Sequence, residues 1–218
     1  MKKEILLLTM KLVIVYSVLL GLTAVPLLFQ MLTENSIGRL FGKMFTYFLM
    51  AGTVFVFYKN KKKIFMELGY SAKNLGKQIC ASGFLLMITI SIFVLLPLLC
   101  GVNKEYVLSV KQQNVVGQII FLLLFVGPVE EFIFRGYFQQ QLEKLIRNKT
   151  VVCIVTSILF GFMHFPLTRN FINVTWIFII GLIYSVAKTK WKDCTIISVS
   201  LAHGLHDSII FILSCILL

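Results

Sequence analysis

Long apolar stretches separated by short polar segments fill the 218-residue chain. A helix needs roughly 20 residues to cross the hydrocarbon core of a bilayer, and most of these stretches approach or exceed that length. They cover residues 12–31, 44–58, 79–102, 115–138, 151–166, 171–187 and 194–218. The second and fifth stretches are short, so the pattern defines their ends poorly. The sequence therefore predicts an all-α, polytopic transmembrane helical bundle with about seven spans, seven or eight in number.

The segments between these stretches alternate between rich and poor in lysine and arginine. Basic residues precede the first stretch and follow the second, fourth and sixth: Lys2, Lys3, Lys59, Lys61, Lys62, Lys63, Lys73, Lys77, Lys144, Arg147, Lys149, Lys188, Lys190 and Lys192. The alternate segments carry only Arg39, Lys43, Lys104, Lys111 and Arg169. Because lysine and arginine accumulate in cytoplasmic loops, this alternation predicts an amino terminus in the cytoplasm and a carboxyl terminus outside.

The composition agrees with a membrane protein and excludes several other classes. Hydrophobic residues make up 58% of the chain and charged residues only 14%, whereas soluble domains carry about 25% charged residues. A disordered chain or a nucleic-acid-binding module would need far more polar surface. The formal net charge of +12 is therefore attributed to cytoplasmic loops and anionic lipid, with no nucleic-acid partner. No repeat or linker interrupts the chain, which predicts a single integral-membrane domain over residues 1–218.

Charged residues interrupt the fourth predicted span. Glu130 and Glu131 stand side by side, and Arg135 follows four residues after the second. A carboxylate at the bilayer centre costs at least about 2.5 kcal/mol, so two of them indicate a function. Glu131 and Arg135 share a helix face and can form an ion pair, although such a pair could be purely structural. Gly127-Pro128, just before the acids, removes a backbone hydrogen bond and predicts a kink.

All three histidines also lie in predicted spans. His164 follows Phe160 by four residues in the fifth span. In the last span, His203 and Asp207 share a face, while His206 faces away and is assigned the ordinary role of a hydrogen-bond donor between helices. The five cysteines show no paired-ligand spacing and are interpreted as buried hydrophobic residues.

Depth along the helices decides whether these polar groups can meet. At a rise of 1.5 Å per residue, Glu130, His164 and His203 lie roughly 14 to 20 Å from the cytoplasmic ends of their helices. The spacing therefore predicts one intramembrane polar site near mid-membrane. Its expected members are Glu130, Glu131, His164, His203 and Asp207.

In this order and spacing, the polar residues resemble the three-motif signature of the CPBP family of intramembrane endopeptidases. That family comprises CAAX proteases and bacteriocin-processing enzymes and is also called the Abi family. The matching residues are Glu130-Glu131-x-x-x-Arg135, Phe160-x-x-x-His164 and His203-x-x-x-Asp207. The resemblance covers residues 115–218, which it identifies as the motif-bearing catalytic half; the first hundred residues match only as generic spans.

The resemblance implies an enzyme that hydrolyses a peptide bond inside the bilayer. Glu130 would be the general base that activates water, and His164 would help to position that water. Glu131 would support the site through Arg135. A glutamate in an apolar site can take a proton from water, so the residue chemistry agrees with these roles.

The resemblance further implies that His203 and Asp207 stabilise the oxyanion. Asp207 departs from family members that have asparagine at this position. An ionised aspartate cannot donate a hydrogen bond, so it would have to be protonated or act by orienting His203.

A metal cofactor is not predicted. Two glutamates and two histidines could furnish zinc ligands, and the family has often been labelled a metalloprotease family. The HExxH spacing of zinc proteases is absent, however, and the family resembles metal-free glutamate enzymes. Zinc therefore stays as the alternative. A serine mechanism has less support, because no spacing between a base and a nucleophile singles out Ser157, Ser200 or Ser208.

The sequence thus predicts an intramembrane endopeptidase in the plasma membrane of a bacterial cell. Its expected partners are the lipid bilayer and a hydrophobic or membrane-bound peptide substrate, with a role in bacteriocin immunity or peptide maturation. Two alternatives stay open. One is a non-catalytic membrane immunity or adaptor protein whose polar cluster only fixes helix packing. The other is a proton-coupled transporter, for which no inverted repeat is found.

Overall fold

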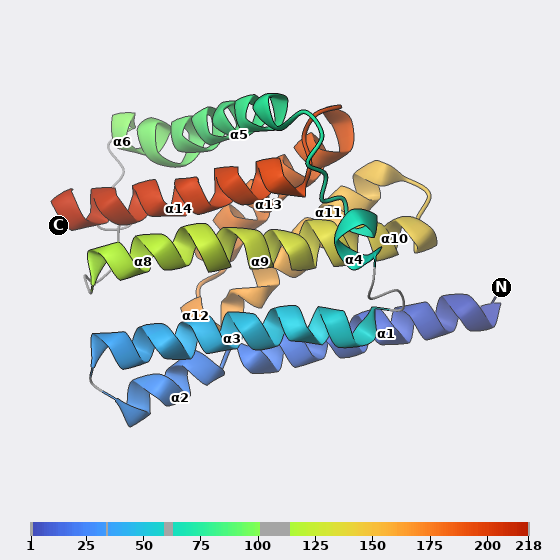
Figure 1. Cartoon of the computed structure of the whole chain (residues 1–218), viewed down its shortest axis with the longest axis horizontal. Helices are drawn as coiled ribbons and strands as arrows, with labels where there is room; N and C mark the ends of the chain where they lie inside the picture. Colours follow the sequence, from blue (N-terminus) through green and yellow to red (C-terminus); the bar gives the residue numbers. More distant parts are fainter. Residues whose placement is uncertain (1, 34, 59–62, 101–113, 218) are drawn as a thin grey trace.

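The computed structural model describes residues 2–33, 35–58, 63–100 and 114–217, which are helical almost throughout and include no strand. The helical elements are α1 (Lys2–Leu22), α2 (Val25–Leu32), α3 (Ser36–Phe57), α4 (Ile64–Glu67), α5 (Leu75–Ile90), η2 (Ser91–Leu95), α6 (Leu96–Leu99), α8 (Val115–Phe121), η3 (Leu122–Val126), α9 (Gly127–Glu131), η4 (Phe132–Phe138), α10 (Gln139–Leu145), α11 (Lys149–Met163), α12 (Phe165–Thr168), α13 (Phe171–Lys190) and α14 (Ile196–Leu217). The long helices lie side by side, with α1 and α5 at opposite edges of the bundle (Figure 1).

Among the described residues, seven helices are long and apolar enough to cross a membrane. They are Lys2–Leu32, Ser36–Phe57, Leu75–Leu99, Val115–Leu145, Lys149–Thr168, Phe171–Lys190 and Ile196–Ile216. The predicted all-α bundle of seven spans is therefore confirmed, and the chain is a multi-pass membrane protein. The two short stretches are complete spans of 22 and 20 residues. The predicted end of the third span at 101–102 and the loop charges at 59, 61, 62, 104 and 111 lie outside the described residues.

Asparagine side chains set where four of the spans begin. The carboxamide oxygens of Asn35, Asn114, Asn148 and Asn170 accept hydrogen bonds from backbone N–H groups in the first turns of α3, α8, α11 and α13. Asparagine is among the favoured residues at this position, because its side chain satisfies N–H groups that have no partner within the helix. These caps extend the second and fifth spans beyond their apolar stretches.

The fourth span contains two wide π-helical turns, η3 and η4, on either side of α9. The N–H of Gly127 bonds to the carbonyl of Leu122, five residues earlier, instead of four. This wider turn precedes Pro128, which cannot donate a backbone hydrogen bond. At Gly127-Pro128, where a kink was predicted, the helix thus changes locally to the wider π hydrogen-bonding pattern. At the second π turn, the Lys188 ammonium from α13 donates to the carbonyl of Arg135 at 2.6 Å.

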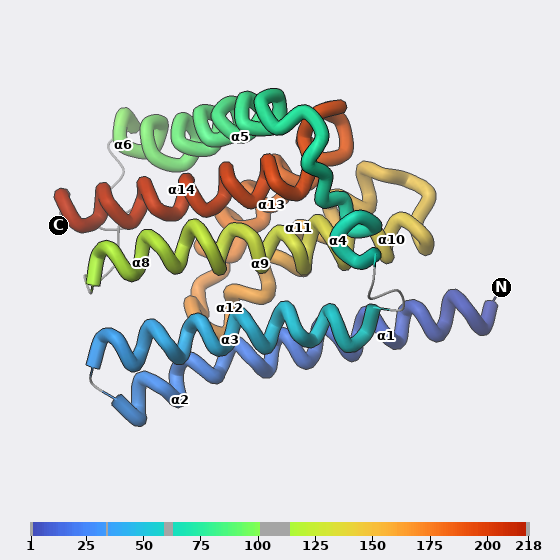
Figure 2. Tube along the Cα trace, viewed as in Figure 1, coloured from blue at the N-terminus to red at the C-terminus, as the bar shows by residue number. Residues whose placement is uncertain are grey.

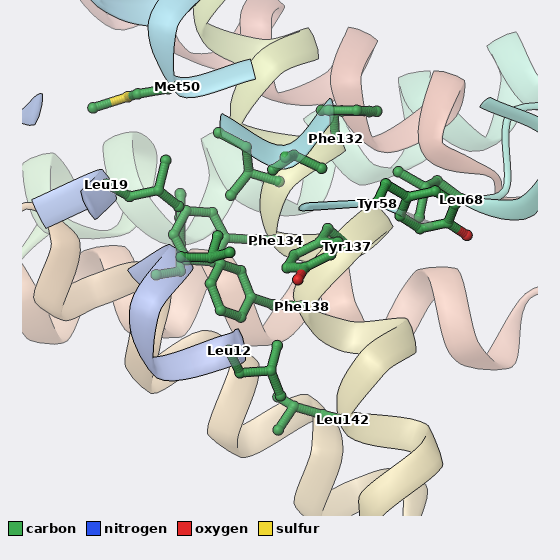
Figure 3. Close-up of a cluster of buried hydrophobic side chains, with 14 of the residues drawn as sticks. Leu12, Leu19, Met50, Tyr58, Leu68, Phe132, Phe134, Tyr137, Phe138 and Leu142 are labelled. Atoms are coloured by element: carbon green, nitrogen blue, oxygen red, sulfur yellow. The ribbon is translucent and has the colours of Figure 1, made fainter. Parts of the chain in front are cut away.

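The largest cluster of buried hydrophobic side chains lies where α1 and the second half of α3 meet η4 and α10 (Figure 3). Phe134 and Phe138 are fully buried there and stack with ring centroids 5.7 Å apart. The Tyr16 ring meets the Phe138 ring edge-on, and its hydroxyl donates to the carbonyl of Leu159 at 2.8 Å. This core fills the half of the bundle nearest the start of α1. Residues 2 and 217 lie at opposite ends of the bundle, as an odd number of spans requires (Figure 2).

Candidate functional site

Two glycines let α9 and α14 cross with their backbones in contact. A Cβ atom at Gly127 would lie 2.5 Å from the carbonyl oxygen of Ser200 and 2.7 Å from the nitrogen of Gly204. A Cβ at Gly204 would lie 3.0 Å from the carbonyl oxygen of Leu122. All three distances are shorter than ordinary carbon contacts, so neither position has room for a side chain. The close crossing brings the acidic residues of the fourth span to the histidines of the last.

Glu131 lies at the centre of a buried polar cluster. Its Oε1 accepts a hydrogen bond from Nη1 of Arg135 at 3.0 Å and lies 2.8 Å from Nδ1 of His203. The side chains of Glu131 and Arg135 are completely buried. The predicted Glu131–Arg135 ion pair is therefore present, and it joins the fourth span to the last through the His203 ring.

Arg135 is fixed on its other side by α11 and α13. Its Nη2 donates to the carbonyl of Gly181 at 2.8 Å, and its guanidinium lies 4.4 Å from the centre of the Phe160 ring. A Cβ at Gly181 would lie 2.9 Å from this Nη2, so the glycine makes space for the guanidinium. Such an arginine over an aromatic ring gains cation–π attraction as well as hydrogen bonds. Arg135 is thus a buried residue that joins its own helical turn, η4, to α9, α11 and α13.

Glu130 points the other way and contacts three helices. Its Oε1 accepts a hydrogen bond from the hydroxyl of Tyr47 on α3 at 2.5 Å. The same oxygen lies 3.8 Å from Nε2 of His164, and Oε2 lies 3.8 Å from Nε2 of His203. These two 3.8 Å separations exceed a direct hydrogen bond but are within reach of one bridging water molecule. Oδ2 of Asp207 lies 3.4 Å from the same Nε2 of His203.

Hydrogen bonds fix the proton positions on both histidines. Nδ1 of His164 is 3.0 Å from the carbonyl oxygen of Phe160, which can only accept, so Nδ1 carries the proton. Nδ1 of His203 likewise faces the Glu131 carboxylate. In their neutral forms, both rings therefore present an unprotonated Nε2 toward Glu130.

A cavity of about 430 Å³ lies next to Glu130 and the two histidine rings. Its polar lining consists of Gln30, Lys43, Tyr47, Glu130, His164, His203 and Asp207. Its apolar walls are Pro26, Leu27, Phe121, Leu122, Val126, Phe160, Leu167, Ile177 and Ile180. An apolar cleft of this size with a few convergent polar groups is typical of a ligand or substrate site.

The structure brings all six candidate residues together, but not all at the cavity. Glu130, His164, His203 and Asp207 line it, whereas Glu131 was expected to do so and instead lies behind His203. The side chain of Arg135 lies behind the cavity as well. Because adjacent residues on a helix point about 100° apart, only one of the two neighbouring glutamates can face the opening.

The role expected for His206 is wrong. Its side chain is 1% exposed, and among the described residues neither ring nitrogen has a hydrogen-bond partner. Its ring meets Phe93 edge-on at 6.1 Å. His206 therefore packs as an aromatic side chain instead of donating a hydrogen bond between helices.

Sequence reasoning missed Tyr47, which makes the shortest hydrogen bond to Glu130. Tyr47 follows Lys43 by four residues on one face of α3, and both side chains line the cavity. A polar aromatic residue one turn from a lysine inside an apolar stretch was the available signal. The partner of Tyr47 depends on the rotation of α3, which the sequence does not provide.

The described residues do not fit a metal centre. Within 2–33, 35–58, 63–100 and 114–217, no group of three or more histidine, cysteine, aspartate or glutamate side chains is arranged to hold a metal ion. The serines near the histidines are not in the cavity lining either. Ser157 and Ser208 donate to the carbonyls of Cys153 and Gly204 on their own helices.

One comparison with known proteins gives a match. The family model described as "Type II CAAX prenyl endopeptidase Rce1-like" matches residues 112–209. This segment holds all three motifs and ends two residues after Asp207. No curated protein and no solved structure matches the chain.

Proposed function

We propose that this protein is a CAAX-type intramembrane endopeptidase in which water activated by Glu130 hydrolyses the peptide bond. The match of residues 112–209 to the Rce1-like family model, which is a CPBP family model, supports this proposal. The observation that carries the proposal is the position of Glu130. Its carboxylate lies at the bottom of the cavity, 2% exposed, with one oxygen held by Tyr47 and the other facing His203. The substrate is a hydrophobic or membrane-associated peptide, which fits the apolar cavity walls.

The arrangement provides a general base and a means of orienting water. A water molecule between Glu130 and His164 would donate one hydrogen bond to the carboxylate and one to the unprotonated Nε2 of His164. Its lone pair is then free to attack a peptide carbonyl carbon, while Glu130 accepts the proton. Glu130 afterwards gives this proton to the leaving amine, which completes the hydrolysis.

The buried cluster behind the cavity positions the His203 ring. Glu131 accepts from Nδ1 of His203, and Arg135 fixes Glu131 from the other side. A carboxylate behind a histidine determines the orientation of the ring and which nitrogen is protonated, as in other hydrolytic sites. Arg135 and Glu131 therefore act through His203 and do not contact substrate.

The loop charges support an orientation in the bacterial plasma membrane with the amino terminus in the cytoplasm. The cavity is lined from α2, α12 and the first half of α3, which lie at the end of the bundle opposite α4 and α10 (Figure 1). The buried cluster around Phe134 and Phe138 fills the other half. In this orientation, substrate enters from the outer half of the membrane. A peptide that arrives from outside, such as a bacteriocin, is a substrate of this kind, and self-immunity is the physiological role that we propose.

The first experiment compares the wild type with Glu130→Gln and His164→Ala at equal membrane expression. Glu143→Gln, a change at an exposed position of α10, is the matched control. Each protein, in liposomes, receives a library of hydrophobic peptides with and without a chelator, and mass spectrometry identifies the products. Loss of a general base lowers the rate about 100-fold to 10,000-fold, so cleavage by the wild type and the control alone is expected.

Other results would change the conclusion. Cleavage that persists in Glu130→Gln would contradict the proposed base. Activity that is lost on chelation and restored by zinc would establish a metal mechanism. If no form cleaves any peptide, the bacteriocin sensitivity of cells that carry Glu130→Gln decides between a narrow-specificity protease and a non-catalytic immunity protein.

A further inference from the structure

Lys43 is the one lysine or arginine among the described residues that line the cavity. It lies on α3 one turn before Tyr47, which corresponds to about 6 Å along the helix axis. A lysine inside a span usually extends its side chain to water at the membrane surface. Lys43 is instead directed into the bundle, because its Nζ donates to Oε1 of Gln118 on α8 at 3.4 Å. This bond is long, so the ammonium group keeps donors for another partner.

Lys43 and its neighbour Arg39, one turn earlier on α3, have no negatively charged partner. No carboxylate of the described residues forms an ion pair with either cation. Both side chains line a narrow cleft that adjoins the cavity, with Ser36, Asn114 and Gln118 as its neutral polar members. The cleft lies between α3 and α8, which run side by side at this end of the bundle (Figure 1).

The lack of a counter-ion indicates that an anion binds here. Nε of Arg39 is buried and has no hydrogen-bond partner among the described residues. Charged groups inside a membrane protein are costly and are usually paired, and two cations on successive turns also repel each other. A negatively charged ligand beside Lys43 would remove both costs.

The charges of the cavity favour a peptide carboxylate at Lys43. The other ionised groups of its described lining, Glu130 and Asp207, are carboxylates and repel a second carboxylate. The walls are apolar, and a hydrogen bond between charged groups is stronger in such surroundings than in water. An acidic peptide in the cavity is therefore most stable with its carboxylate beside Lys43.

We propose that Lys43 is a specificity-determining residue that binds a carboxylate of the peptide substrate. This proposal rests on the proposed function, which assigns the cavity to a peptide. The reacting carbonyl lies beside Glu130, whose Oε1 is bonded to Tyr47. An extended chain advances about 3.3 to 3.6 Å per residue, so the separation of about 6 Å between Tyr47 and Lys43 corresponds to about two residues of substrate. Lys43 lies outside residues 112–209, so the family match does not include it.

The test uses hydrophobic peptides in matched forms. One set has aspartate, asparagine or lysine at successive positions, and the other set has a free C-terminal acid or a C-terminal amide. The full-length wild type is compared with Lys43→Met, Lys43→Glu and a control, Lys11→Met. Lys11 is an exposed lysine of α1 that does not line the cavity. Peptide binding and cleavage are both measured in phosphatidylcholine liposomes, which carry no net charge.

A hydrogen bond between charged groups contributes about 10-fold to 100-fold to binding. We expect the wild type and Lys11→Met to prefer the acidic form by this factor in binding and in kcat/KM, mainly through KM. Lys43→Met should lose the preference. Lys43→Glu should reverse it and favour lysine over aspartate, or the amide over the free acid, which a merely structural lysine would not produce. Each preference is a ratio within one protein, so partial misfolding of a variant does not change it.

The two sets of peptides identify the source of the carboxylate. A preference for aspartate over asparagine assigns it to a side chain, and a preference for the acid over the amide assigns it to the C-terminus. Equal binding and cleavage of the acidic and neutral forms by the wild type would overturn the proposal and leave Glu130-dependent proteolysis intact. A full preference in Lys43→Met would do the same.

Failure of the proposed function gives a different pattern. Binding that prefers the carboxylate and depends on Lys43, without cleavage of any peptide, would overturn the proteolytic function and support the carboxylate site. Neither binding nor cleavage of any peptide would overturn both.

Discussion

A methyl group at Gly127 should separate the two helices that form the site. The added Cβ would lie 2.5 Å from the Ser200 carbonyl oxygen and 2.7 Å from the Gly204 nitrogen, both backbone atoms that cannot rotate away. Ordinary contact begins near 3.4 Å, so α9 and α14 must move apart by about 1 Å, a displacement that can cost about 100-fold in rate. The 2.8 Å contact between His203 and Glu131 would then exceed hydrogen-bond distance.

The expected cost in stability is about 1 to 3 kcal/mol, typical of overpacking in a close-packed interior. Gly83→Ala on α5 is the matched control, since a Cβ there meets nothing within 4 Å. In a helix interior, alanine is more stable than glycine by about 0.5 to 1 kcal/mol, so the control should be neutral or stabilised. Thermal unfolding in detergent and the rate of peptide cleavage are measured for both variants and the wild type.

Two results together would refute the reasoning: a Gly127→Ala protein that unfolds at the same temperature as Gly83→Ala, and a cleavage rate within about threefold of the wild-type rate. The expected rate is about 100-fold lower than that of the wild type. Such a result would mean that α9 and α14 can separate without disturbing His203. A protein that is destabilised but fully active would confirm the close packing and contradict only its link to catalysis.

Three further variants test the surroundings of the site. Arg135→Lys keeps the charge but lacks the planar fork that bonds both Glu131 and the Gly181 carbonyl. The free energy of unfolding, measured by thermal unfolding, should therefore fall by about 2 kcal/mol or more. Lys188→Met leaves the Arg135 carbonyl without its donor and should cost about 1 to 3 kcal/mol in the same assay, whereas Lys190→Met should cost nothing measurable. His206→Leu removes two buried nitrogens that have no partner among the described residues, so unfolding should occur at an equal or higher temperature, and a destabilised protein would reveal an unrecognised hydrogen bond.

The number of spans and the main polar residues could be predicted because both can be recognised from the order of residues along the chain. A membrane-crossing helix needs a long apolar stretch, and ionisable residues inside such a stretch are costly enough to be conspicuous. The i, i+4 spacing of Glu131 and Arg135 also identified their ion pair, because it depends only on the geometry of one helix. These features require no knowledge of how the helices pack.

Contacts between helices could not be predicted in the same way. Tyrosine is common in membrane proteins and costs little there, so Tyr47 gave no warning of its bond to Glu130. The place of Glu131 behind His203 follows from the Gly127–Gly204 crossing, which depends on helix rotation. The surroundings of His206 were hidden for the same reason: they depend on which elements pack against α14, such as η2, whose Phe93 ring meets the His206 ring edge-on.

The residues of the site come from four different spans, and this has a consequence for biosynthesis. Tyr47 belongs to the second span, Glu130 to the fourth, His164 to the fifth and His203 to the seventh. Chains are made from the amino terminus, so the earlier helices enter the membrane before α14 exists. A nascent chain therefore holds Glu130 without the His203 ring that faces it, and the site is complete only after the seventh helix packs against the fourth. On the proposed mechanism, a chain that stalls before this point would be unable to cleave a peptide.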